Sequence, residues 1–337
     1  MIYEVIPSLL FIQIPVAIFM YFDSKKRMVE NPLFWTIGIA LFLPFFLPFY
    51  LLLRPRKTFF YCPVCEAKNM FPSHSCPSCG MEIKSQELIH AQGEWKFIDV
   101  LTIIFLSLFI IPMSLGGLAN LLGILTNDWT EWSNMFYFGI AGSASLILLS
   151  IWFVVKVCKR PLSDVGLTSN KLYRNILLGI IVLVPAFFIE LTSEELIVRS
   201  SILIFPSQSD YILKLQEKEH SGESYVWPET SDQLAKLIGA TFLMVVLGPI
   251  GEEILFRGLA YSILRQRRSK LAAIIIVSII FALAHSQIIH FMPIFIMGII
   301  LAYLYERTGS IVPSIALHSS INLLLTFLWY YRPDIYT

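Results

Sequence analysis

Two groups of residues in this 337-residue chain have types and spacing that are suited to chemistry. The first is a set of four cysteines in two C-x-x-C pairs, Cys62, Cys65, Cys76 and Cys79. Each pair can present two thiolates from one tight turn, and the set is typical of tetrahedral zinc coordination. Two disulfides or free thiols are the alternatives. Because four cysteine ligands leave no open coordination position, we expect a structural and not a catalytic zinc.

The second group lies in an apolar stretch, where residues 249 to 258 read PIGEEILFRG. A charge at membrane depth costs at least ~2.5–3.5 kcal/mol on insertion scales, so these residues are candidates for function. On a helix, Glu253 and Arg257 are four apart and lie on one face, which makes Glu253 the structural partner of the arginine. Glu252 is rotated by about 100° and is freer to face a cavity. We therefore predict Glu252 as the catalytic base.

Two further polar pairs follow on separate apolar segments. Phe281 and His285 in FALAH are four apart, as are His318 and Asn322 in HSSIN, so each pair shares a helix face. A buried glutamate beside a histidine can activate a water as general base and return the proton to a leaving amine. A histidine and an asparagine can donate two N–H groups to an oxyanion, a contribution of ~2.7–4 kcal/mol per donor. The pattern predicts amide hydrolysis, although a single histidine on an apolar helix is more often a packed core residue.

The composition predicts that the glutamate and histidine motifs lie on helices that cross a membrane. The chain is 56% hydrophobic and 15% charged, with a mean hydropathy of +0.70, whereas soluble domains average ~25% charged residues. We expect an all-α, multi-pass protein of the cell membrane with eight or nine segments and the lipid bilayer as its surroundings. A net charge of +1 gives no reason to expect nucleic acid as a partner. Runs of spanning length occur near 4–22, 33–53, 98–124, 135–157, 174–193, 234–256, 271–289, 291–305 and 311–330.

One polar insert divides the chain. We predict a membrane hairpin over 1–53, a zinc ribbon over 54–94, membrane helices over 95–159 and a second membrane domain over 160–337 that holds the glutamate and histidine motifs. Ribbons of this kind often bind other macromolecules, so a protein partner is expected for it. The fifth cysteine, Cys158, stands alone in KVCKR and is interpreted as a residue at the membrane edge.

Proline and glycine predict two interruptions in these helices. Gly248, Pro249 and Gly251 form a cluster at which the helix should bend or restart beside the two carboxylates. Pro44 and Pro48 allow a re-entrant or broken second segment.

The positive charges of short loops predict orientation. By this rule we expect NDWTEW (127–132) and a segment near 196–232 to lie on the outer side of the membrane. The second segment is expected to hold a short interfacial helix. The SKKR sequence at 24–27 conflicts with the alternation unless the second segment is broken. The basic clusters assigned to the cytoplasm are 54–57, 156–160, 265–270 and 306–307.

EEILFR, FALAH and HSSIN resemble, in this order, the three motifs of the CPBP family. These are the type II CAAX prenyl endopeptidases and bacteriocin-protection proteins, also called the Abi family. The usual forms are E-E-x-x-x-R, F-x-x-x-H and H-x-x-x-N, and the likeness covers roughly 160–330. Residues 1–97 lie outside it, and a chain with its own zinc ribbon resembles bacterial members.

The resemblance implies a glutamate-dependent intramembrane protease with a cavity open toward the cytoplasm. In that interpretation Glu252 and His285 activate water, and His318 and Asn322 stabilise the oxyanion. Glu253, Arg257 and Phe281 would support the site, and no catalytic cofactor is expected. An older view of the family assigns a catalytic metal to the same residues, and zinc fits two histidines and a glutamate by ligand type.

Two functions of different classes are compatible with these residues. One is an endopeptidase that cuts a hydrophobic or membrane-anchored peptide. The other is a non-catalytic membrane scaffold or bacteriocin-immunity protein, which would use the polar network for packing and the ribbon for binding. Intact motifs favour the enzyme, because a scaffold needs the Glu253 and Arg257 pair but has little use for Glu252, His285 and His318 together. A transporter would normally show paired interrupted helices in two halves.

Overall fold

The computed structural model describes residues 2–56, 58–62, 64–70, 75–82, 92–123, 132–224 and 234–331. It is a helical protein with one small sheet, in agreement with the expected fold class. The chain forms two compact units. The first comprises Met1–Leu106 and Ile151–Pro161, and the second comprises Ser107–Ser150 and Leu162–Thr337.

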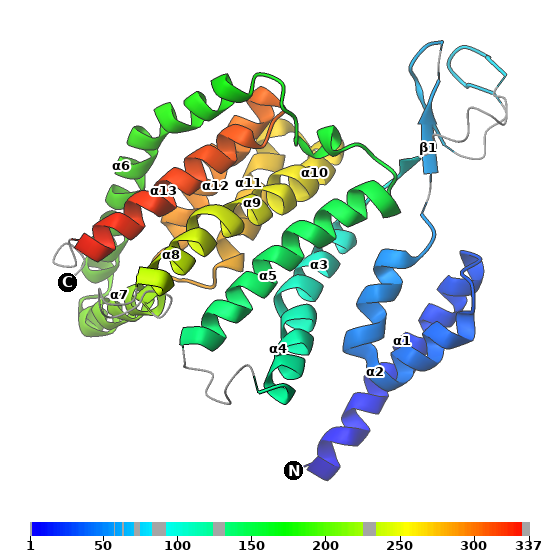
Figure 1. The fold of residues 1–337 in the computed structure, drawn as a ribbon, viewed down its shortest axis with the longest axis horizontal. Coiled ribbons are helices and arrows are strands. Elements are labelled where there is room, and N and C mark those ends of the chain that lie inside the picture. Colours follow the sequence, from blue (N-terminus) through cyan, green and yellow to red (C-terminus); the bar gives the residue numbers. More distant parts are fainter. Residues whose placement is uncertain are drawn as a thin grey trace. The chain divides into compact units, whose positions relative to one another are not determined.

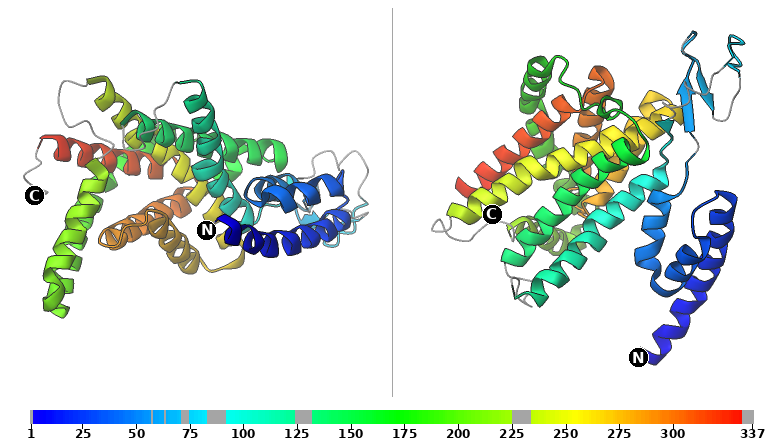
Figure 2. Two further views of the ribbon diagram at one scale, coloured as in Figure 1. Left: turned by 90° about the horizontal axis from the view of Figure 1, so that it is seen from below. Right: turned by 45° about the vertical axis from the view of Figure 1, so that its right-hand side comes forward.

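The first unit contains a helical hairpin and the cysteine-bearing insert. The hairpin helices lie side by side (Figures 1 and 2), and a three-stranded antiparallel sheet of order β2-β1-β3 follows them. Its elements are α1 (Ile2–Lys26), α2 (Pro32–Leu53), β1 (Thr58–Tyr61), β2 (Lys68–Met70), β3 (Gln92–Gly93), α3 (Phe97–Phe105) and the π-helical η3 (Phe153–Val157).

The second unit is a bundle of helices in which α13 packs against α6 and α12, and α12 packs against α11 (Figure 1). The π-helical η2 (Leu106–Ile110) joins α3 to this unit. Its elements are α4 (Ile111–Leu121), α5 (Trp132–Trp152), η4 (Leu162–Val165), α6 (Leu172–Ile204), η5 (Pro206–Gln208), α7 (Ser209–Ser224), α8 (Leu234–Phe242), η6 (Leu243–Leu247), α9 (Gly248–Glu252), η7 (Glu253–Tyr261), α10 (Ser262–Arg267), α11 (Lys270–Ala284), α12 (Phe291–Thr308) and α13 (Val312–Tyr331).

The helices confirm a multi-pass membrane protein. Among the described residues, six helical runs are long and apolar enough to cross a bilayer, and two shorter apolar helices accompany them. The first of these, Lys270–Ala284, ends one residue before His285, and the second, Val312–Leu328, contains His318 and Asn322. The polar segment contains a helix, α7, as predicted, and its interfacial position stays a prediction. Residues 225–233 of that segment lie outside the described residues.

The second membrane segment is broken inside its apolar run, as its prolines allow. Phe42 leaves helical geometry, with φ −139° and ψ 59°, two residues before Pro44. Proline cannot donate a backbone hydrogen bond, and its ring restricts the residues that precede it, so a kink at this place has a local cause.

The Gly-Pro-Ile-Gly cluster does not end the helix, although a restart is one of the two effects that its sequence predicts, and it lies between two π-helical segments. The helical run from Leu234 to Arg267 does not restart there but continues through two π-helical segments, η6 and η7. A π turn accommodates one extra residue, which changes the face on which later side chains lie. The second of these segments begins at Glu253, so the altered winding lies directly at the paired glutamates.

Close helix contacts in the second unit depend on glycine. A Cβ atom at Gly179 of α6 would lie 2.5 Å from the Pro313 carbonyl oxygen of α13. A Cβ at Gly298 of α12 would lie 3.0 Å from the Ser278 Cβ of α11. These contacts bring α6, α11, α12 and α13 close enough for their polar side chains to meet.

In the first unit, charged side chains tie the insert to the helix ends. Arg56 pairs with the buried Asp99 carboxylate at 2.6 Å, and its guanidinium lies over the Phe153 ring. Asp99 also accepts the Lys96 backbone N–H and so caps α3. The Arg160 guanidinium stacks 3.9 Å from the centre of the Trp95 ring. Buried pairs and cation–π contacts of this kind fix orientation at a helix end.

Candidate active site

A buried ion pair lies at the centre of the second unit. Arg257 Nη1 donates to Glu253 Oε1 at 2.8 Å, and both side chains are 0% exposed. The predicted pairing of these two residues is therefore present. Arg257 Nη2 also donates to the Gly298 carbonyl at 3.4 Å, which links the pair to α12. Removal of either partner would leave an uncompensated charge in an apolar interior.

Glu253 has a second partner that the sequence did not reveal. His318 Nδ1 lies 3.0 Å from the same Glu253 Oε1, although the residues are 65 positions apart. A carboxylate only accepts hydrogen bonds, so His318 Nδ1 carries the proton and donates. The His318 Nε2 atom is thereby left for another contact. Glu253 thus orients a histidine as well as neutralising an arginine.

Glu252 lies between the two predicted histidines. Its Oε2 atom is 3.9 Å from His285 Nε2 and 3.9 Å from His318 Nε2. Neither distance is a direct hydrogen bond, and both are within the reach of one bridging water. Within the described part of the chain, this oxygen is buried and has no hydrogen-bond partner. The Glu252 side chain is nevertheless 29% exposed and that of His285 is 31% exposed, so the group is accessible.

The tautomer of His285 is also fixed by its surroundings. Its Nδ1 lies 2.8 Å from the Phe281 carbonyl oxygen, one turn earlier on α11. Since a carbonyl only accepts, Nδ1 donates and Nε2 presents its lone pair toward Glu252. Both imidazoles therefore direct Nε2 to one carboxylate oxygen, and a different acceptor holds each Nδ1.

Phe281 packs at the centre of these groups. Its ring contacts His285 and His318 edge to face, with centroid distances of 4.7 and 5.9 Å. The Arg257 guanidinium lies 4.3 Å from the same ring centre. The aromatic side chain is buried and packs against both imidazoles.

Asn322 lies one turn from His318 and donates to a backbone carbonyl of the π-helical segment η6. Its side-chain N–H donates to the Met244 carbonyl at 2.8 Å. A π-helix pairs each carbonyl with the N–H five residues later, as the Leu243 carbonyl pairs with the Gly248 N–H in η6. By the same spacing, the Met244 carbonyl would pair with the nitrogen of Pro249. Proline has no N–H, so the Met244 carbonyl takes its donor from Asn322 instead. Within the described residues, the other amide hydrogen of Asn322 has no acceptor.

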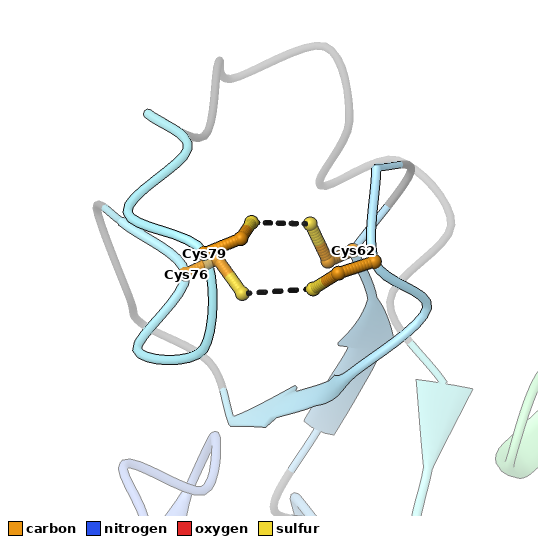
Figure 3. Close-up of side chains that lie close together, drawn as sticks. Cys62, Cys76 and Cys79 are labelled. Carbon is orange, nitrogen blue, oxygen red and sulfur yellow. Dashed lines mark hydrogen bonds between the residues drawn. The ribbon is translucent and has the colours of Figure 1, made fainter.

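The four cysteines form a second candidate site, in the first unit. The thiol groups of Cys62, Cys76 and Cys79 point into one site in Figure 3. The distance is 3.6 Å from Cys62 Sγ to Cys79 Sγ and also from Cys65 Sγ to Cys76 Sγ. A disulfide needs ~2.05 Å, whereas the edge of a ZnS4 tetrahedron is ~3.8 Å for Zn–S bonds of ~2.3 Å. The disulfide alternative does not fit these distances, and the donor set fits zinc.

The two cysteine turns have matching backbone hydrogen bonds. Glu66 N–H donates to Cys62 O in the first turn, and Gly80 N–H donates to Cys76 O in the second. Both donors have left-handed backbone angles, with φ 57° at Glu66 and 74° at Gly80. Asn69 is buried and its amide lies 3.6 Å from Cys76 Sγ, where it can support a thiolate. The two turns thus have equivalent backbone geometry, and their four thiols could hold a metal ion between them.

Other residues do not gather ligand atoms in this way. Within the described ranges, the four cysteines are the one group of three or more His, Cys, Asp or Glu residues placed to hold a metal ion. Glu252, His285 and His318 do not form such a group. Cys158 is fully buried at the end of η3, and its carbonyl accepts the Gly93 N–H. Burial raises the pKa of its thiol to about 12, and it lies outside the cluster.

A polytopic helical membrane protein with a buried Glu, Arg and His network is the class defined by this fold and site. Residues 234–324 match the family model described as "Type II CAAX prenyl endopeptidase Rce1-like". This range contains all three motifs, so the family resemblance inferred from the sequence is confirmed for this part of the chain.

Two relatives are similar to parts of the chain. "Putative membrane peptidase YdiL" of Bacillus subtilis (strain 168) is 31% identical over 104 residues, which are 30% of this chain and 43% of the relative. "UPF0177 protein YxdF" of Lactococcus lactis subsp. lactis (strain IL1403) is 26% identical over 127 residues, which are 36% of this chain and 70% of the relative. The chain thus spans less than half the length of the first relative. No solved structure is significantly similar to it.

Proposed function

We propose that this protein is an intramembrane endopeptidase that hydrolyses a peptide bond of a hydrophobic or membrane-anchored peptide. The observation that carries the proposal is the position of Glu252 Oε2, 3.9 Å from Nε2 of both His285 and His318. The family match over 234–324 and the name of the Bacillus relative support a membrane peptidase. The glutamate-dependent mechanism and the peptide substrate are our own inference.

In the first step, a water molecule held by Glu252 and His285 attacks the scissile carbonyl. Glu252 accepts one proton from the water as the new C–O bond forms, and the carbonyl π electrons move to the oxygen. His285 Nε2 accepts a hydrogen bond from the water, because Nδ1 is already donating to the Phe281 carbonyl. Glu252 Oε2 supports this assignment, because it is buried and accepts no hydrogen bond within the described residues. It can therefore accept one from the water.

In the second step, His318 and Asn322 stabilise the oxyanion and the amine leaves. Since His318 Nδ1 donates to Glu253, His318 can donate from Nε2 only as an imidazolium, a charge that the Glu253 carboxylate stabilises. Asn322 contributes its second amide hydrogen, because the first bonds to the Met244 carbonyl. Protonated Glu252 then gives its proton to the leaving nitrogen as the C–N bond breaks.

The test separates the two adjacent glutamates. Membranes with the wild-type chain are expected to cleave fluorogenic hydrophobic peptides, and Glu252→Gln should lower the rate by ~10²–10⁴ because the general base is lost. The amide keeps the shape of the side chain, so the yield and melting temperature of this variant should match the wild type.

Two outcomes would refute the proposal. A Glu252→Gln chain that cleaves as fast as wild type would remove the base from the mechanism. Wild-type membranes that cleave none of a broad panel of hydrophobic peptides, while binding a partner through the ribbon, would favour the scaffold instead.

A further inference from the structure

One carboxylate outside the candidate active site has an unusual number of hydrogen bonds. Glu219 of α7 accepts from the Ile288 N–H at 2.7 Å and from the Ile289 N–H at 3.0 Å. It also accepts from the His290 N–H at 3.2 Å and lies 3.1 Å from His290 Nδ1. Its side chain is only 9% exposed. A single buried carboxylate thus binds three consecutive backbone amides some 70 positions further along the chain.

These amides belong to the turn that begins α12. His290 is the N-cap residue of that helix, and no side chain of the cap itself satisfies the first amides. Free amides and the positive end of the helix dipole favour an anion at this place. Glu219 supplies that anion from another helix. Of the amides it binds, that of His290 lies at the helix end and the other two lie in the turn before it, so α7 secures the turn that leads into α12.

A second layer of contacts fastens α7 to α6 at the same turn. His290 Nε2 lies 3.5 Å from Glu194 Oε2 of α6, and Gln216 of α7 donates to Glu194 Oε1 at 2.9 Å. Val198, Ile212 and Ile289 form a buried apolar cluster beside them. The carboxylate of Glu219 therefore does not swing freely, because packing and hydrogen bonds hold both the helix that carries it and the turn it binds.

The turn leads directly to the candidate active site. Residues 286–290 connect α12 to His285, which is the C-cap residue of α11. Ser286 has φ 57°, a left-handed conformation that is strained for an L-residue. Such a conformation persists only where surrounding contacts enforce it. The contacts on the far side of Ser286 are those of Glu219.

We propose that Glu219 is a positioning residue for His285. By binding the amides of 288–290, it holds the strained turn closed and fixes the imidazole opposite Glu252. The inference rests on the proposed function for its catalytic consequence, but its structural consequence can be measured without any substrate. Glu219 itself touches neither the reacting atoms nor Glu252.

The experiment compares Glu219→Gln with Glu217→Gln, an exposed carboxylate on the same helix. The glutamine keeps the shape but loses the charge and half of the acceptor capacity. We expect kcat for a cleaved peptide to fall at least tenfold in Glu219→Gln with KM changed less than threefold. Amide hydrogen exchange over 285–290 should become at least tenfold faster, while exchange in α13 stays as in the wild type. Glu217→Gln should change none of these quantities.

A second variant separates positioning from general stability. Glycine adopts positive φ without strain, so Ser286→Gly added to Glu219→Gln favours the native turn and should recover at least threefold in kcat. A double variant no more active than Glu219→Gln would assign the loss to destabilisation and overturn the positioning role.

The exchange measurement keeps this inference distinct from the proposed function. If the wild-type protein cleaves no peptide, the enzymatic proposal fails. Faster amide exchange over 285–290 in Glu219→Gln would still support the role of Glu219 in holding this turn. Unchanged amide exchange over 285–290 would show that Glu219 does not hold this turn, whatever the catalytic result.

Discussion

The cysteine ribbon of the first unit and the glutamate and histidine site of the second gather their functional groups from very different lengths of chain. The four cysteines lie within residues 62–79, on two turns with the same hydrogen-bond pattern. The second site joins Glu252 and Glu253 to His285 at the end of α11 and to His318 on α13. One site is encoded locally, and the other exists only when three helices pack.

The comparison shows how local and dispersed sites are held together. A metal ion can organise a short insert with little core of its own, because each ligand bond replaces packing that the insert lacks. The dispersed site instead relies on buried hydrogen bonds, in which Glu253 serves Arg257 and His318 at once. Damage to the ribbon should therefore stay local, whereas damage to Glu253 should spread through the second unit.

The largest effect is expected from loss of cysteine ligands. Elemental analysis of the wild-type chain should find one zinc per molecule, and the variant with Cys76→Ser and Cys79→Ser should hold none, because two thiolates are not enough for a tetrahedral structural site. The ribbon should then become sensitive to proteolysis. Cleavage of a peptide by the second unit should persist in this variant and in the presence of chelators.

Cys158→Ser is the matched control, since that thiol lies outside the cluster, and its zinc content should equal that of the wild type. Stoichiometric zinc that survives in the ribbon variant would mean that the second site binds the metal, and the contrast between the two sites would be lost.

Loss of the Glu253 carboxylate should have the next largest effect. Glu253→Gln removes the partner of a fully buried arginine, and breaking such a pair costs ~3–5 kcal/mol. The measurement is the melting temperature and folded yield in detergent. Arg265→Gln is the control, because the Arg265 and Glu306 pair is partly exposed and should contribute less than ~1 kcal/mol. Equal losses in the two variants would show that the central pair is not buried as described.

The smallest effect is expected in the first cysteine turn. Glu66 adopts the left-handed conformation that Gly80 adopts in the second turn. Glu66→Gly relieves backbone strain of ~1–2 kcal/mol. Glycine also raises the conformational entropy of the unfolded chain, which offsets ~0.4–1 kcal/mol of this gain. Zinc should therefore bind ~2–5-fold more tightly.

Competition with a chromophoric chelator measures this affinity, and Gly80→Ala is the mirror-image control, expected to weaken binding by a similar factor. If neither substitution changes the affinity, the two cysteine pairs are not held by the equivalent turns inferred here.

Much of this molecule could be predicted from short-range patterns. The C-x-x-C spacing predicted the cysteine cluster, because two residues between cysteines are enough for one turn to present both thiols. Apolar runs predicted the membrane helices, since their length must match the hydrocarbon layer. The four-residue spacing predicted the Glu253 and Arg257 pair, because a helix repeats every 3.6 residues. Each of these features depends on neighbours in the sequence.

Other features were decided only by the tertiary structure. The sequence predicted a bend or restart at Pro249. The helix does not restart there, and the π-helical segments on either side of this cluster were not foreseen. The Met244 carbonyl that proline leaves without a donor accepts from Asn322 of α13. The partnership of Glu253 with His318, and that of Glu219 with the turn at 288–290, likewise join distant elements. Hydrogen bonds between helices depend on how each helix is rotated, and one extra residue in a π turn rotates every later side chain. The spacing of residues along one helix does not predict that rotation. The packing of the neighbouring helices determines it.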